Sequence, residues 1–215
     1  MAKILLIHGS TVGLEYSFFK KKDLKYGYFR GIRSLIDSGK VDLFVWADRQ
    51  DKAKTWELHK ILQMYNRERT DINDSKHSHK LYEKLDNAKY TTIITHSMGG
   101  ELLVKMIQDC GLPQSVKNIY TLASDAPAKL YIEDFDLHTR LNDQSLNWYN
   151  YHCYWDGALL TSLIINRRLS AGLGGYKTNL NIQNQFYPLH GSVDLHTSII
   201  ASPKEIEKIC YRHLH

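Results

Sequence analysis

The segment Thr95-His96-Ser97-Met98-Gly99-Gly100 lies between a predicted strand and a predicted amphipathic helix. A serine on such a sharp turn is held above a sheet with its hydroxyl exposed near the helix N-terminus, which suits it to act as a nucleophile. The turn needs small neighbours because the two backbones nearly touch. Gly99 meets this need, while Thr95 stands where glycine is more common. The backbone N–H of Met98 would point into the same site, so the segment predicts acyl chemistry with one oxyanion donor in place.

Side chains that could assist this serine follow other predicted strands. Asp125 and Asp156 each come directly after a strand candidate, and either carboxylate could orient a histidine. His190 follows the last strand candidate, and His196 lies in the loop before the terminal helix. Either imidazole could take the serine proton. The residue types and spacing leave both choices open.

The placing of these residues depends on a regular alternation of strands and helices. Apolar and β-branched runs predict strands over residues 4–7, 41–46, 90–95, 118–123, 148–155 and 185–189. Helical periodicity and capping residues predict helices over residues 15–37, 74–86, 98–109, 159–168 and 204–214. Such alternation is typical of a mostly parallel sheet with helices on both faces. Ligands bind such sheets beyond the carboxyl ends of the strands, where the candidate residues fall.

Four pieces of the chain together resemble the α/β-hydrolase superfamily, in particular its serine esterases and lipases. They are Ile4–Gly9, His96–Gly100, Tyr154–Leu159 and the region from His196 to Pro203. They occur in the family's order and span nearly the whole chain, and the piece around the serine is the most specific. The tract from Asp156 to Gly175 resembles small intracellular or phage-type members. The resemblance implies the α/β-hydrolase fold and a triad in the order Ser, Asp, His.

The resemblance assigns a role to each candidate of the triad. Ser97 would be the nucleophile and Asp156 the acid, because most of the family carries its acid after the corresponding strand. Asp125 stays as the alternative acid, since some members place it after the preceding strand. His196 would be the base, because its place in a loop before the terminal helix matches the family. His190 stays as the alternative base.

The resemblance also implies an oxyanion hole at the end of the first strand. Its second donor would be the backbone N–H of Ser10, with Thr11 as the alternative, beside that of Met98. His8, in the same turn as Ser10, is expected to brace the loop rather than to do chemistry. His96, beside the nucleophile, is expected either to pack around it or to support the catalytic residues without touching substrate.

No metal site and no cofactor are expected. His77 and His79 lie on one predicted helix but lack the i, i+4 spacing of a metal-binding pair. The three cysteines, Cys110, Cys153 and Cys210, show no CxxC spacing. Their odd and sparse number favours a reducing compartment over a disulfide framework, so a cytoplasmic location is expected.

The chain has 215 residues and a mass of 25.0 kDa, which predicts a single domain over residues 1–215. The segment 128–147, between the two candidate acids, could form a small lid. No apolar run reaches the length of a membrane span, and the apolar stretch near the N-terminus is too short for a signal peptide.

The net charge of +5 is mild for a dedicated nucleic-acid-binding protein, so no nucleic-acid partner is expected. Basic and aromatic residues do gather in the segment 16–33, around Lys20–Lys22. A solvated helix face explains this segment better than contact with an anionic membrane. The sequence does not indicate an oligomeric state.

The sequence therefore predicts a serine hydrolase that cleaves a carboxylic ester, such as a small-molecule or lipid-like ester. The same triad would also serve an acyltransferase or a thioesterase. A binding protein that keeps the fold without catalysis is the alternative outside enzymes, since a fold does not imply a function.

Overall fold

The computed structural model describes residues 3–10, 13–14, 26, 28–46, 52–53, 58–188 and 196–214. Within these residues, six strands form one parallel sheet in the order β3-β1-β5-β6-β7-β8. Its strands are β1 (Ile4–Ile7), β3 (Val41–Phe44), β5 (Thr92–His96), β6 (Asn118–Leu122), β7 (Asn147–His152) and β8 (Gln183–Phe186). A separate short pair joins β2 (Gly13–Leu14) and β4 (Lys52–Ala53). The predicted α/β class with a parallel sheet is confirmed.

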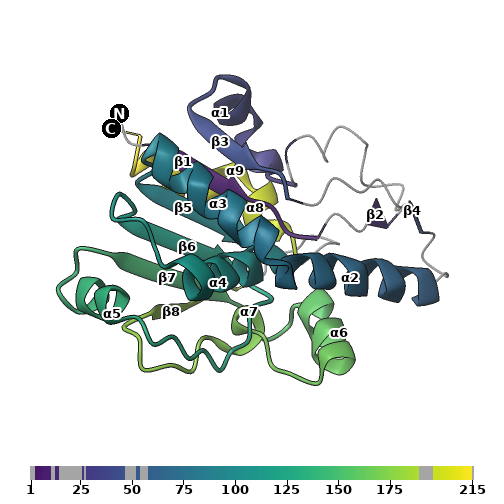
Figure 1. Cartoon of the computed structure of the whole chain (residues 1–215). Coiled ribbons are helices and arrows are strands. Elements are labelled where there is room, and N and C mark those ends of the chain that lie inside the picture. The colour runs from purple at the N-terminus through teal and green to yellow at the C-terminus, as the bar shows by residue number, and fades with distance from the viewer. Residues whose placement is uncertain are drawn as a thin grey trace.

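Helices lie on both faces of this sheet (Figure 1). They are η2, a 3₁₀ turn (Arg30–Ile32), α1 (Arg33–Asp37), α2 (Leu58–Asn73), α3 (Ser75–Ala88), α4 (Met98–Cys110), α5 (Phe135–Asn142), α6 (Gly157–Asn166), α7 (Ala171–Gly174), α8 (Ser198–Ala201) and α9 (Pro203–Tyr211). Helices α3 and α4 pack on one face, whereas α8, α9 and η2 pack on the other. Among the described residues, no helix is both long enough and apolar enough to cross a membrane.

The interior strand β1, between β3 and β5, shows why the sheet is covered on both sides. All four of its residues are buried, and they point alternately to the two faces. Leu5 and Ile7 join the apolar cluster of α3 and α4, while Ile4 and Leu6 join that of α8 and α9. A strand of four consecutive aliphatic residues can be stable only between two apolar layers. The run that predicts this strand therefore also explains the three-layer arrangement.

The order of the strands creates a topological switch beside β1. The chain passes from β1 to β3 on one side and returns through β5 on the other side. Ile7 of β1 pairs with Thr95 of β5, so these two strands end next to each other. The crevice beyond such a switch point is where open parallel sheets bind ligands. The turns that follow β1 and β5 contain Ser10 and Ser97.

Several helices begin at a capping side chain. The Asp74 carboxylate accepts the Lys76 amide at 3.0 Å and starts α3, as the sequence predicts. The Asp134 carboxylate accepts the Leu137 amide at 3.0 Å and starts α5. Helix α9 begins with Pro203 in its first turn, where the missing N–H costs nothing.

The structure corrects several predicted boundaries. The strand predicted over 148–155 ends at His152, because the chain turns toward the cap of α6. Of the helix predicted over 15–37, residues 15–25 and 27 lie outside the described residues, and the helical residues in the rest are Tyr26, in a 3₁₀ conformation, and those of η2 and α1. Tyr28 interrupts that stretch, since its φ of 66° is left-handed. The sequence patterns do not predict helix α2.

The segment 128–147 contains α5 and packs against the loop before β6. Arg140 is buried and donates from its guanidinium to the carbonyl oxygens of Leu112, at 3.2 Å, and of Val116. This loop lies at the amino-terminal end of β6, whereas Ser97 follows the carboxyl end of β5. The contact fixes α5 to the core through backbone acceptors that would otherwise be buried without partners.

Candidate active site

Ser97 occupies a strained turn between β5 and α4. Its φ of 52° and ψ of −126° place it in a region that non-glycine residues seldom adopt. Backbone hydrogen bonds hold it there: its N–H donates to Leu122 at 3.1 Å, and its carbonyl accepts from Gly100 at 3.0 Å and from Asp125 at 2.9 Å. The end of β6 and the residues just after it therefore hold the Ser97 turn in place through backbone hydrogen bonds. This is the sharp strand-to-helix turn that the sequence predicts.

Glycines allow this turn to lie against the end of β1. A Cβ at Gly99 would lie 2.6 Å from the carbonyl oxygens of both Ile7 and His8. A Cβ at Gly9 would lie 2.7 Å from the Cβ of Ser97. These distances are well below van der Waals contact, so only glycine fits at either position. The first turn of α4 and the turn after β1 are thereby brought against the same serine.

The two predicted oxyanion donors lie on the two sides of this contact. Met98 is the first residue of α4, so its N–H has no acceptor within the helix. The N-terminus of the helix also favours negative charge. Ser10 follows Gly9, and its hydroxyl donates to the Glu68 carboxylate of α2. This hydrogen bond ties the turn after β1 to α2.

Asp156 and His196 are brought together across forty residues of sequence. The Oδ2 atom of Asp156 lies 2.8 Å from Nδ1 of His196, and only 1% of the Asp156 side chain is exposed, against 16% for His196. A carboxylate can only accept here, so Nδ1 carries the proton and Nε2 is left as the proton-accepting atom. This is the orientation that a general base needs.

The electrostatics of the pair keep the acid ionised. Burial alone would raise the pKa of Asp156, but the attraction and hydrogen bond of His196 and the Leu159 amide together hold it below its usual value. The Leu159 amide donates to Oδ1 at 3.1 Å, because Asp156 is the N-cap of α6. The carboxylate is therefore charged at neutral pH and fixed at both oxygens.

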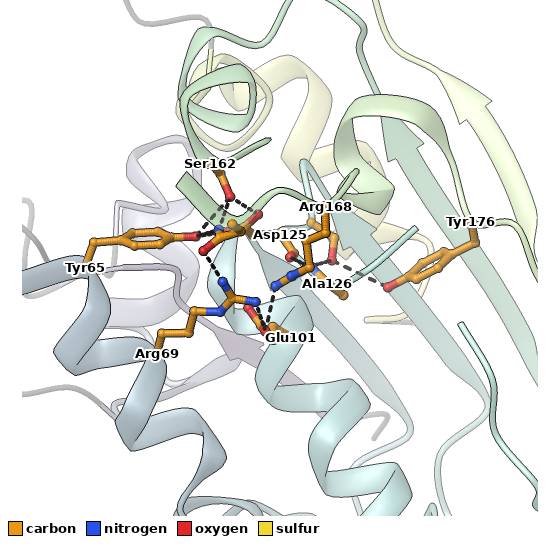
Figure 2. Close-up of polar contacts among 10 residues, drawn as sticks. Tyr65, Arg69, Glu101, Asp125, Ala126, Ser162, Arg168 and Tyr176 are labelled. Atoms are coloured by element: carbon orange, nitrogen blue, oxygen red, sulfur yellow. Dashed lines mark hydrogen bonds and ion pairs between the residues drawn. The ribbon is translucent and has the colours of Figure 1, made fainter. Parts of the chain in front are cut away.

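Asp125, the alternative acid, belongs to a different network (Figure 2). Its carboxylate accepts from the hydroxyl of Ser162 on α6, at 2.7 Å, and from the hydroxyl of Tyr65 on α2. Asn166 joins both hydroxyls, with its amide nitrogen 2.7 Å from Ser162 and 2.8 Å from Tyr65. Asp125 thus links α2 to α6, while Asp156 binds the histidine. His190, the alternative base, lies outside the described residues.

A second part of this network surrounds Glu101 on α4. Arg168 and Arg69 lie 2.7 and 3.3 Å from its Oε1 atom, and Arg168 also donates to the Asp125 carbonyl at 2.8 Å (Figure 2). Burial raises the pKa of Glu101, although both guanidinium groups oppose the shift. Sequence reasoning missed Tyr65, Arg69 and Arg168, because no local pattern marks their contacts. The network fixes α2, α4 and the chain after α6 around the Ser97 turn.

His8 braces the turn after β1, as the sequence predicts. Its Nδ1 donates to the Gly9 carbonyl at 2.6 Å, and its Nε2 accepts the Trp46 amide at 3.3 Å. The two rings stack with centroids 5.6 Å apart, and the Trp46 indole donates to the His8 carbonyl at 2.9 Å. Burial lowers the pKa of His8 to about 4, so the ring is neutral at neutral pH.

The described part of the chain contains no group of three or more His, Cys, Asp or Glu side chains placed to hold a metal ion. Comparisons with protein-family models, with curated proteins and with solved structures found no match to this chain. Within the described residues, the strained Ser97 turn and the hydrogen-bonded Asp156–His196 pair are the features that bear on function.

Proposed function

We propose that this chain has the α/β-hydrolase fold and is a serine hydrolase that cleaves a carboxylic ester. The observation that carries the proposal is the buried Asp156–His196 pair, with 2.8 Å between carboxylate and imidazole. It stands at the same edge of the sheet as the strained Ser97 turn, and His96, the neighbour of Ser97, contacts His196 directly. A charged acid, an oriented imidazole and a serine at a helix N-terminus are the parts that acyl transfer requires.

In the proposed reaction, the Ser97 oxygen bonds to the ester carbonyl carbon while its proton passes to Nε2 of His196. The carbonyl electron pair moves onto oxygen, and the Met98 and Ser10 amides stabilise the charge. The bond to the alcohol oxygen then breaks, and His196 returns the proton to the leaving alcohol. Water attacks the acyl-enzyme by the same route, releases the carboxylic acid and restores Ser97. Asp156 stabilises the imidazolium at each step.

Turnover of activated esters tests this proposal. A series of p-nitrophenyl esters from acetate to laurate would define the preferred acyl chain. On the best of them, Ser97→Ala should lower kcat by roughly 10⁴–10⁶ while the protein stays folded. Unchanged turnover by Ser97→Ala would refute the assignment. Product analysis with added alcohols separates hydrolysis from acyl transfer, because an acyltransferase would form a new ester.

A further inference from the structure

His96 ends β5 and points toward the base rather than into the layer of α3 and α4. Ile94, two residues earlier, packs in the cluster of α8 and α9, and side chains two apart share a face of a strand. The imidazole of His96 lies edge-on to Phe29, with centroids 6.4 Å apart. Its centroid is 4.7 Å from that of His196. His96 therefore lies between the sheet and the segment that carries the base.

The His96 ring binds the main chain of His196. Its Nε2 atom lies 2.9 Å from the His196 carbonyl oxygen. A carbonyl oxygen can only accept, so Nε2 must carry the proton and Nδ1 must be bare. Nδ1 is buried and has no hydrogen-bond partner among the described residues. A Cβ added at Gly9 would lie 3.2 Å from Nδ1, so the Gly9 backbone packs closely against this side of the ring.

The environment keeps His96 in this one form. It is 2% exposed, and burial followed by the neighbouring His196 lowers its pKa to about 3. The ring is therefore neutral wherever the proposed triad could work. In the proposed reaction His196 becomes a positively charged imidazolium. Because His96 is neutral, this imidazolium does not face a second positive charge.

We propose that His96 is a positioning residue, whose Nε2–H holds the backbone of His196 so that the imidazole keeps the orientation set by its hydrogen bond to Asp156. His196 is then held by Asp156 on its side chain and by His96 on its main chain. The inference rests on the proposed function, since it gives His96 a purpose only if His196 is a base.

Two substitutions separate the hydrogen bond from the volume of the ring. His96→Phe keeps a planar ring but removes the donor, and His96→Gln keeps an N–H donor near the Nε2 position. We expect His96→Phe to lower kcat about 10- to 100-fold with little change in KM, because a small displacement of a catalytic group costs this much. His96→Gln should recover most of the loss. A purely structural role would change the melting temperature and leave kcat of the folded fraction intact.

His138 offers a matched control. Its Nε2 also faces a backbone carbonyl, that of Ile132 at 3.2 Å, but it lies in α5. His138→Phe should leave kcat unchanged. Equal kcat for wild type, His96→Phe and His96→Gln would overturn the positioning role while Ser97 chemistry stands. A folded wild type whose Ser97 never reacts with a fluorophosphonate would overturn the proposed function, and the positioning role with it.

Should His96→Phe not fold, the native protein still provides a test. The imidazole ¹⁵N spectrum should show His96 protonated at Nε2, bare at Nδ1 and free of titration between pH 5 and 8. A His96 ring that is protonated at Nδ1, or that titrates with a pKa near the ordinary 6.5, would contradict the inference.

Discussion

The carboxylate of Asp156 binds the His196 ring with one oxygen at 2.8 Å and caps helix α6 with the other, which accepts the Leu159 amide at 3.1 Å. The acid of the proposed triad is thus also the residue that starts α6. An N-cap fixes the side chain in one orientation, because the helix amide is rigid. The orientation of His196 therefore depends on where α6 begins.

Two substitutions of Asp156 should separate these roles. Asn is as good an N-cap as Asp, so Asp156→Asn should keep the cap and lose only the stabilising charge of the carboxylate, yet lower kcat roughly 10³–10⁴-fold by presenting the wrong partner to His196. Asp156→Ala should lose activity similarly and also destabilise the protein by about 1 kcal/mol through the lost cap. Ester turnover and chemical denaturation measure the two effects. Full activity in Asp156→Asn would exclude Asp156 as the acid.

Asp125→Asn is the counterpart at the alternative acid. The change weakens the hydrogen bonds from Ser162 and Tyr65, so the free energy of unfolding should fall by about 1–3 kcal/mol. The folded fraction should keep kcat within about tenfold of wild type, because the His196 contact is untouched. If Asp125→Asn instead lost activity as severely as Asp156→Asn, the assignment of the acid would have to be reversed.

Gly99→Ala should disrupt the turn at Ser97. The added methyl would meet the backbone oxygens of Ile7 and His8 at 2.6 Å, and the backbone at the end of an interior strand cannot easily move aside. We expect a loss of about 1–3 kcal/mol in the free energy of unfolding and a lower labelling rate at Ser97. Gly157→Ala is the control, since no atom lies within 4 Å of its added Cβ. That change should be neutral or slightly stabilising.

Stability should fall as the pH drops from about 6.5 toward 4. His8 and His96 have pKa values lowered by burial to about 4 and about 3, so in this range the unfolded chain binds protons that the folded chain does not. Each such histidine lowers the free energy of unfolding by up to about 1.4 kcal/mol per pH unit. His152 and His213, whose pKa values burial also lowers, act in the same direction.

Urea denaturation at a series of pH values measures this dependence. His96→Gln removes one titrating ring, so its stability should vary less steeply with pH than that of wild type. The stabilising charge of Asp156, whose pKa is lowered, is lost as the pH falls through and below the usual carboxyl range, so it contributes little between pH 7 and pH 5. A free energy of unfolding that stays constant from pH 7 to pH 5 would contradict the neutral, buried state of both histidines.

The sequence predicts the elements whose signals are local. The aliphatic run of β1, the cap at Asp74 and the small residues after Ser97 each act within a few positions, so they can be recognised without a structure. They are enough to predict the parallel sheet and the nucleophile turn. The choice between Asp125 and Asp156 cannot be made from the residues, because both follow a strand and both suit a turn.

The features that the sequence does not predict depend on contacts between distant segments. Helix α2 is one of them, although its Tyr65 and Arg69 reach across to the ends of β6 and α6. The sequence places His96 beside Ser97 as a packing or supporting residue but does not predict its partner, because the carbonyl that it binds lies a hundred positions further along the chain. Only the folded arrangement brings these partners together.

Labelling with a fluorophosphonate, followed by mass spectrometry of the adduct, tests the central claim most directly. Such probes react with a serine only when a base and an oxyanion hole activate it. We predict one adduct on Ser97, abolished in Ser97→Ala and strongly slowed in Asp156→Asn. A folded wild-type protein that takes up no probe, or that carries the adduct on another residue, would contradict the proposal that this protein is a serine hydrolase with Ser97 as its nucleophile.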